Sequence, residues 1–289
     1  MTSEAGGMAV ADVGSGRAVL LLHGQPGLGR DWAAVSTLLD DRYRLIAPDR
    51  PGYGGTGGAA TGLFGNAAAA AGLLDELGIE EAVVVGHSLG GGIALAMAQR
   101  HPERVSALVL VASVGAPSSV DLLDRVLAWP VVGEMLAFVA FRYLGRFLKS
   151  PPALHRSNRF APELAVLEPE KLRVRAARWQ AERVWEAFSV EQRALVAELP
   201  VVVARMGDIR VPTVVVAGRR DSIVGPAASA ALAHAITGAE LRWVDGGHLL
   251  TVEAPEAVAA AVTAAASLPP GAGPGEGPDP PPPARGRVS

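Results

Sequence analysis

A serine in a glycine-rich pentapeptide is the side chain of this chain best suited to nucleophilic chemistry. The peptide is Gly86-His87-Ser88-Leu89-Gly90, which follows the apolar run Ala82–Val85 and precedes the helical pattern Gly92–Arg100. A strand, a tight turn and a helix in this order need small residues at the turn, and they lift the serine hydroxyl above the sheet. We therefore predict that Ser88 is a catalytic nucleophile. The alternative is a strand-to-helix turn in which the serine only caps the helix.

A serine hydroxyl is a weak nucleophile until a base removes its proton. The chain has six histidines, and His248 lies in Gly246-Gly247-His248, between the apolar run Leu241–Val244 and a helix that begins near Ala254. This places His248 at the carboxyl end of the last strand, where the functional groups of parallel sheets gather. We predict that His248 is the base; a histidine in a surface loop is the alternative.

The base needs an acid that fixes its tautomer and stabilises its charged form. Asp221 ends the segment Gly218-Arg219-Arg220-Asp221, directly after the apolar run Thr213–Ala217. The order serine, aspartate, histidine along the chain is one of the known orders of such a triad. We predict Asp221 as the acid. The alternatives are a turn aspartate without a catalytic role and an acid that follows the run Val105–Val111, where the nearest aspartate is Asp121.

Attack on a carbonyl also needs hydrogen-bond donors for the developing oxyanion. The run Ala18–Leu22 leads into His23-Gly24-Gln25-Pro26-Gly27, whose glycines let backbone amides approach a ligand closely. We predict that the amides of Gln25 and Leu89 form the oxyanion hole and that the Gln25 side chain contacts substrate. An ordinary Gly/Pro turn is the alternative. His23 and His87 are expected to support the site from behind the reacting groups.

Short apolar strand patterns that alternate with helical patterns must hold these residues in place. They predict an α/β fold with a doubly wound, mostly parallel sheet, because strands buried on both faces are apolar throughout. The alternation stops after Val111 and resumes at Val211, so a helical cap is expected to be inserted between them. The predicted units are a core of residues 1–116 and 206–267, a cap of residues 117–205, and a disordered Pro/Gly-rich tail of residues 268–289.

Aromatic residues are concentrated in the predicted cap and favour an apolar substrate. We predict that Trp129, Phe141, Trp179 and Trp185 contribute to substrate binding, although packing within the cap is the competing explanation for each. The apolar stretch Val126–Phe141 is expected to pack in the core rather than to meet lipid or a partner. A basic run is expected to lie on a solvated helix face; its members are Lys171, Arg173, Arg175, Arg178 and Arg183.

Taken together, these segments resemble the α/β-hydrolase superfamily, in its serine-nucleophile branch with a helical cap. The matching stretches, in order, are His23–Gly27, Asp49-Arg50-Pro51-Gly52-Tyr53-Gly54, Gly86–Gly91, Gly218–Asp221 with Ile223-Val224, and Gly247-His248 with Glu253-Ala254-Pro255-Glu256. The resemblance implies an eight-stranded sheet with one antiparallel strand and a cap over the site. The residues before Met8 depart from it, because they are too few and too glycine-rich for a first strand.

Serine at position 88 points, within that family, to acyl chemistry, whereas aspartate there would suggest dehalogenase or epoxide hydrolase chemistry. The leading hypothesis is a serine hydrolase that cleaves an ester-like bond of a small apolar substrate through an acyl-enzyme. A second is a carbon–carbon bond hydrolase, or a cofactor-free triad enzyme, acting on a polyketide-like or ring-ketone substrate. A third is a small-molecule binding or sensing protein without catalysis.

Composition limits the other functions. The chain has 289 residues, 49% of them hydrophobic, and a net charge of −3, which gives no basic excess for nucleic acid. It has no cysteine, which excludes disulfides, thiolate catalysis and cysteine-based metal centres. We expect no metal, no cofactor and no membrane contact, and a small-molecule substrate as the partner. No secretory signal is visible in Met1–Gly7, so a cytoplasmic location is expected. The oligomeric state is left open.

Overall fold

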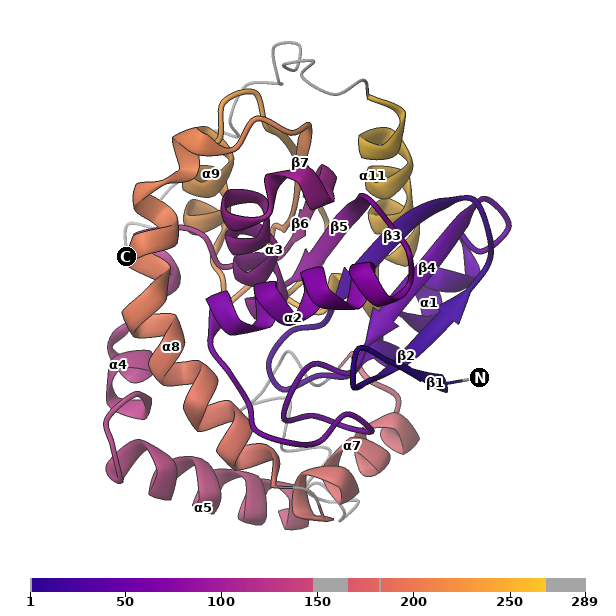
Figure 1. Ribbon diagram of the computed structural model, residues 1–289. Coiled ribbons are helices and arrows are strands. Elements are labelled where there is room, and N and C mark those ends of the chain that lie inside the picture. Colours follow the sequence, from indigo (N-terminus) through magenta and orange to yellow (C-terminus); the bar gives the residue numbers. More distant parts are fainter. Residues whose placement is uncertain (1, 148–165, 182, 269–289) are drawn as a thin grey trace.

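The computed structural model describes residues 2–147, 166–181 and 183–268 (Figure 1). The predicted tail therefore lies outside the described residues, except for its first residue, Leu268.

Eight strands form one sheet in the order β1-β2-β4-β3-β5-β6-β7-β8. β2 runs antiparallel to both of its neighbours, and all the remaining pairs are parallel, as predicted for a mostly parallel sheet with one antiparallel strand. The strands are β1 Thr2–Ala5, β2 Met8–Val13, β3 Arg17–Leu22, β4 Tyr43–Pro48, β5 Ala82–His87, β6 Val105–Val111, β7 Thr213–Gly218 and β8 Glu240–Val244.

The expectation that no strand precedes Met8 is wrong. β1 pairs with β2 in a hairpin whose closing pair is Ala5 and Met8. The connecting residues are Gly6 and Gly7, with φ angles of 62° and 66°. Two-residue hairpin turns of this kind need positive φ at both positions, and glycine adopts it without steric cost. The two glycines, which make a first strand unexpected from the sequence, thus allow the chain to fold back into the hairpin.

Helices cover both faces of the sheet (Figure 1). Alternate strand residues separate into two cores: Val19 and Leu21 of β3 face one, while Leu20 and Leu22 face the other. Such alternation follows from the two-residue period of a strand. The helices that cover the sheet are α1 Ala33–Thr37, α2 Leu63–Glu76, α3 Leu89–Arg100, α9 Pro226–Ala235, α10 Leu250–Glu253 and α11 Pro255–Ser267, with short 3₁₀ turns at Gly29–Trp32, Pro102–Arg104, Pro117–Ser119 and Met206–Asp208.

A helical insertion leaves the sheet after β6 and returns to it before β7. Its described helices are α4 Leu122–Leu127, α5 Val132–Phe147, α7 Pro169–Ala181 and α8 Val184–Ala204. In Figure 1, α5 and α7 lie below the sheet and α8 runs upward along its left side. The later turns of α8 pack into the core of the sheet through Leu195, Leu199 and Val202. Packing therefore divides α8 between the insertion and the core.

The apolar stretch in the insertion is more exposed than its sequence predicted. Ala137 and Phe141 of α5 are buried, whereas Val131 is 73% exposed and Met135 is 59% exposed. One stripe of the helix thus packs inward and the opposite stripe meets solvent, so the expectation that Val126–Phe141 packs in the core is wrong for most of its length. Among the described helices, none is both long and apolar enough to cross a bilayer.

Candidate active site

Ser88 occupies a strained turn between β5 and α3. Its φ of 54° and ψ of −120° lie in a region that side chains other than glycine rarely adopt. Two backbone bonds hold the turn: the Ser88 amide donates to Val111 O at 3.0 Å, and the Gly91 amide donates to Ser88 O at 3.0 Å. Strain of this kind persists where the surroundings over-determine it, and it is concentrated at functional sites.

The glycines beside Ser88 are there because no larger residue fits. A Cβ on Gly86 would lie 2.3 Å from Gly90 O, and a Cβ on Gly90 would lie 2.2 Å from Leu22 O. Both distances are far inside van der Waals contact. The first turn of α3 can therefore pack directly against the ends of β5 and β3 only with glycine at these two positions.

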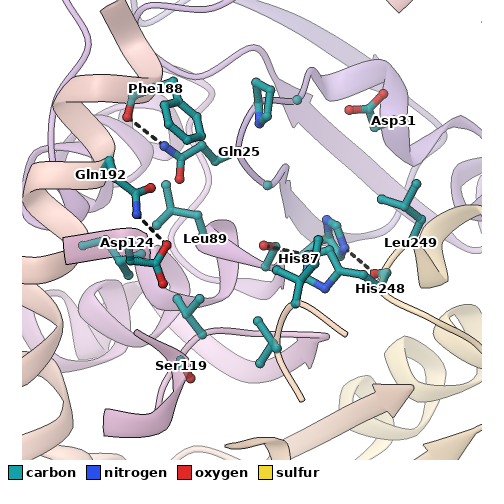
Figure 2. Close-up of a pocket in the computed structure, with 18 of the residues that line it drawn as sticks. Gln25, Asp31, His87, Leu89, Ser119, Asp124, Phe188, Gln192, His248 and Leu249 are labelled. Carbon is teal, nitrogen blue, oxygen red and sulfur yellow. Dashed lines mark hydrogen bonds between the residues drawn. The ribbon is translucent and has the colours of Figure 1, made fainter. Parts of the chain in front are cut away.

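Three side chains from distant parts of the sequence meet at the carboxyl edge of the sheet. His248 Nε2 lies 3.0 Å from Ser88 Oγ, and His248 Nδ1 lies 2.9 Å from Asp221 Oδ2. Ser88, Asp221 and His248 are 9%, 4% and 5% exposed. Figure 2 shows His248 beside His87 and Leu249. The residues proposed from the sequence as nucleophile and base therefore lie within hydrogen-bonding distance of each other in the folded chain.

Asp221 is held so that one carboxylate oxygen faces the imidazole. The amides of Ile223 and Val224 both donate to Asp221 Oδ1 at 2.9 Å, which leaves Oδ2 for His248. A carboxylate only accepts hydrogen bonds, so Nδ1 of His248 carries the proton and Nε2 accepts from the Ser88 hydroxyl. This tautomer is the one that a general base requires. Asp121, the alternative acid, instead accepts from the Asp124 amide at 2.9 Å and caps α4.

Two side chains fix the loop that carries His248. Glu253 accepts from the Gly247 amide at 2.8 Å and from the Leu249 amide at 3.1 Å, so its carboxylate brackets the histidine. His87 Nε2 donates to the His248 carbonyl at 2.9 Å. Burial, and then the nearby His248, lower the pKa of His87 to about 4, so His87 stays neutral. The sequence placed His87 behind the site, but it gave no role to Glu253.

The loop after β3 lies against the nucleophile. A Cβ on Gly24 would lie 3.0 Å from the Ser88 Cβ and 2.9 Å from His87 Nδ1. The backbone amides of Gln25 and Leu89 have no hydrogen-bond partner among the residues that the structure describes. The Gln25 side chain does not point freely into the site, because its Nε2 donates to Phe188 O of α8 at 2.8 Å (Figure 2).

A cavity of about 540 Å³ opens over Ser88 and His248 between the sheet edge and the insertion. This is a usual size for a small-molecule site. Its walls are mostly apolar and include Leu89, Val114, Leu195, Val224 and Val252. Figure 2 shows Asp124 and Gln192 on the side of the cavity opposite His248, with Gln192 Nε2 donating to Asp124 Oδ1 at 2.6 Å. Burial raises the pKa of the Asp124 carboxyl.

The aromatic residues predicted to bind substrate divide into two groups. Trp179 lines the cavity together with Gln25 and with Phe188 of α8. Trp129, Phe141 and Trp185 are not among the residues that line it. Trp129 is 58% exposed, and the Phe141 ring lies behind the wall, 5.4 Å from the Trp179 ring. The Trp185 ring packs at 5.6 Å against Phe138.

The basic run also differs from its predicted place on a solvated face. Arg175 lines the cavity and pairs with Asp31 at 2.7 Å, and Arg178 donates to Gly27 O at 3.4 Å. Arg173 follows the expectation, since it meets Glu170 at 3.6 Å on the surface. Arg183 likewise pairs with Glu186 on the surface. The side chain of Lys171 lies outside the described part of the structure. Residues one helical turn apart on α7 thus face the site.

Comparison with known proteins agrees with this architecture. A family model described as the alpha/beta hydrolase fold matches residues 17–255. The chain is 41% identical over 132 residues to a 2-hydroxymuconate semialdehyde hydrolase of Pseudomonas sp. (strain CF600), over 43% of this chain and 47% of that protein. The chain spans less than half the length of the first curated relatives it matches, from 38% to 47%.

Solved structures match over nearly the whole chain. One is Est816, described as an N-acyl homoserine lactone degrading enzyme, with 27% identity and a TM-score of 0.66 over 91% of this chain and 99% of that one. Another is a thermophilic esterase from Thermogutta terrifontis, with 26% identity and a TM-score of 0.65 over 89% of this chain and 92% of that one.

Proposed function

Because the chain belongs to the α/β-hydrolase fold family, we propose that it is a serine hydrolase that cleaves an ester-like bond of a small apolar substrate. The observation that carries this proposal is the continuous hydrogen-bonded row from Asp221 through His248 to Ser88, whose last two members line a cavity of about 540 Å³. The esterase and the lactone-degrading enzyme among the structural relatives support the same bond type.

The proposed reaction passes through an acyl-enzyme. His248 Nε2 removes the Ser88 proton while Oγ attacks the carbonyl carbon, and Asp221 stabilises the imidazolium that forms. The amides of Gln25 and Leu89 donate to the oxyanion of the tetrahedral intermediate. His248 then protonates the leaving alcohol. Water, deprotonated by the same nitrogen, releases the acid and restores the Ser88 hydroxyl.

A second candidate is hydrolysis of a carbon–carbon bond next to a ketone by the same three side chains. The specific observation in its favour is the similarity to a 2-hydroxymuconate semialdehyde hydrolase. The two candidates share Ser88 and His248 but differ in the leaving atom, which is oxygen in an ester and carbon in a diketone. The third hypothesis is a protein that retains the triad but only binds a small molecule. It requires that the ligand occupy the cavity without turnover.

The test combines labelling with turnover. The wild-type protein is treated with a fluorophosphonate and, separately, with p-nitrophenyl esters of increasing acyl length and with a diketone. We expect labelling of Ser88 alone and turnover of a short apolar ester, both lost in Ser88→Ala with unchanged circular dichroism. Retained hydrolysis in Ser88→Ala would reject the site. Turnover of the diketone without the esters would favour the second candidate, and ligand-induced thermal stabilisation without any turnover would favour the third.

A further inference from the structure

A buried ion pair joins the turn after β4 to helix α8. Arg50 is 2% exposed, and the Glu191 side chain is fully buried. Arg50 Nη1 donates to Glu191 Oε1 and Nη2 donates to Oε2 at 3.4 Å, while the Tyr53 hydroxyl donates to Oε2 at 2.6 Å. Removing two charges from water costs several kcal/mol per ion, and an apolar pair of similar volume is often as stable. Stability alone is therefore a weak reason for this pair.

The other side of Arg50 contacts the loop that carries the proposed oxyanion donor. Its Nε donates to His23 O at 3.0 Å and its Nη2 donates to Gly24 O at 3.1 Å. His23 Nδ1 donates to the same Gly24 oxygen at 2.8 Å, and His23 Nε2 accepts from the Arg50 amide at 3.0 Å. Burial and the Arg50 charge lower the pKa of His23 well below its usual value, so the imidazole stays neutral in this arrangement.

These contacts fix the direction of one amide. Gly24 C=O and Gln25 N–H belong to the same planar peptide unit, and this unit is trans, because the cis bond in this loop is the next one, between Gln25 and Pro26. In a trans peptide the carbonyl and the N–H point in opposite directions. A Gly24 oxygen held by Arg50 and His23 on one side therefore aims the Gln25 N–H to the other side.

Helix α8 also contacts Gln25 directly. Phe188 lies one turn before Glu191, and its carbonyl accepts from Gln25 Nε2 at 2.8 Å. One face of α8 thus holds the Gln25 peptide through Arg50 and the Gln25 side chain directly. Phe188 and Gln192, the neighbour of Glu191, also line the cavity. The helix that forms part of the cavity wall is therefore the one connected to the proposed oxyanion donor.

We propose that Glu191 is a positioning residue that, through Arg50, sets the direction of the Gln25 amide for oxyanion stabilisation. This rests on the proposed serine-hydrolase function, since it assigns the Gln25 amide a role in that reaction. Glu191 neutralises the guanidinium and fixes its plane, so that Nε and Nη2 remain on the two loop carbonyls. The insertion consequently contributes to turnover as well as to the choice of substrate.

The test compares Glu191→Gln with Glu198→Gln. Both carboxylates lie on α8 and both accept hydrogen bonds from the core, but the described hydrogen bond of Glu198 comes from the Phe64 amide, at 3.0 Å and at the start of α2, and not from Arg50 or Gln25. We measure kcat and KM for a short activated ester and the affinity for an alkyl boronic acid, whose adduct with serine is tetrahedral.

In Glu191→Gln we expect kcat to fall about 10- to 100-fold with little change in KM, because a displaced donor weakens binding of the transition state more than of the substrate. The affinity for the boronic acid should fall by a similar factor, and Glu198→Gln should resemble wild type in both measurements. An unchanged kcat, a change confined to KM, or equal effects in the two variants would overturn the proposal.

Tyr53→Phe provides a second variant if Glu191→Gln does not fold. It removes one hydrogen bond from Glu191 Oε2 and keeps both charges, so we expect a smaller loss in kcat in the same direction, again with KM nearly constant. A folded Tyr53→Phe with wild-type kcat and boronic acid affinity would then overturn the proposal. The outcomes distinguish failure of the proposed serine-hydrolase function from failure of the proposed positioning role. A wild-type protein that neither labels with fluorophosphonate nor turns over would refute the serine-hydrolase function, whereas an active wild type with unaffected variants would refute only the positioning role.

Discussion

The carboxyl edge of the sheet and the helical insertion above it meet at one cavity, but their side chains are held in different ways. At the edge, each oxygen of the Asp221 carboxylate has a partner, and both ring nitrogens of His248 are engaged. In the insertion, Gln192 donates to Asp124 and Arg175 pairs with Asp31, but the aromatic wall is held by packing. The Trp179 ring contacts Phe141, its Nε1 has no hydrogen-bond partner among the described residues, and Met135 of α5 lies largely in solvent.

The difference separates two kinds of constraint. Hydrogen bonds to backbone amides fix a direction within tens of degrees, whereas apolar packing fixes a volume and tolerates exchange of side chains. We therefore expect changes at the sheet edge to act on turnover and changes in the insertion to act on substrate choice. Glu191 is the proposed exception, because it lies on an insertion helix and acts on the edge.

The largest expected effect is on Asp221, the proposed acid of the triad. Asp221→Asn retains the shape of the side chain but presents an N–H to His248 Nδ1, which favours the wrong tautomer of the base. We expect kcat to fall by about 10⁴-fold. Asp208→Asn is the matched control, because Asp208 lies on the surface and pairs with Arg205 at 2.8 Å. Equal losses in steady-state assays of the two variants would mean that the acid is another residue.

The next effect concerns stability at low pH. His87 has a pKa of about 4 in the folded protein and about 6.5 when unfolded, so between these values only the unfolded state binds the proton. Stability is therefore unaffected by His87 above pH 6.5 and falls as pH decreases toward 4, by about 3 kcal/mol at most. His23 acts in the same direction, because its pKa is lowered as well.

His87→Gln retains a donor for the His248 carbonyl and removes the titrating group. The free energy of unfolding, measured with urea from pH 7 to pH 4, should depend less on pH in the variant than in the wild type. Comparison of slopes, rather than of absolute stabilities, separates the lost titration from any packing defect. Identical slopes would show that His87 is protonated to the same extent in the folded and unfolded states.

A smaller effect is expected at the loop that carries His248. Glu253→Gln replaces one accepting oxygen by an N–H that faces a backbone amide, so the bracket around His248 opens on one side. We expect kcat to fall about tenfold, with KM nearly constant, because the imidazole is displaced from Ser88 by a fraction of an ångström. Glu256→Gln, three residues further on and exposed, should behave as wild type. Loss in KM alone would instead place Glu253 in substrate binding.

The parts of the site that the sequence could predict are those determined by local backbone geometry. Gly86 and Gly90 are required by contacts within a few residues of Ser88 or with the adjacent strand, and Asp221 and His248 directly follow predicted strands. A parallel sheet brings the carboxyl ends of its strands to one edge, so the local pattern was enough to expect their meeting.

The remaining contacts depend on the orientation of helices far apart in sequence. Arg50 and Glu191 are 141 positions apart, and neither position carries a local signal of the other. The sequence shows that the insertion is rich in aromatic residues, but it does not show whether Trp129, which precedes α5, or Trp179, on α7, reaches the cavity. For the same reason the sequence predicts Arg175 and Arg178 on a solvated face, since their spacing on α7 fits a surface stripe as well as one that faces a loop.

The smallest expected effect concerns two tryptophans of the insertion, Trp129 and Trp179, both of which are predicted from the sequence to bind substrate. Trp179→Leu enlarges the cavity, so the KM for a long-chain or ring-containing ester should rise about tenfold while kcat for acetate esters changes little. This is the effect expected when an apolar contact worth about 1–3 kcal/mol is lost. Trp129→Leu should leave both constants unchanged, because that ring is mostly in solvent. Profiles of kcat/KM against acyl length would reveal the difference. An equal change in kcat/KM at every acyl length in Trp179→Leu would mean that α7 acts on the reacting groups. The proposed division, in which the sheet edge acts on turnover and the insertion on substrate choice, would then fail at a second position.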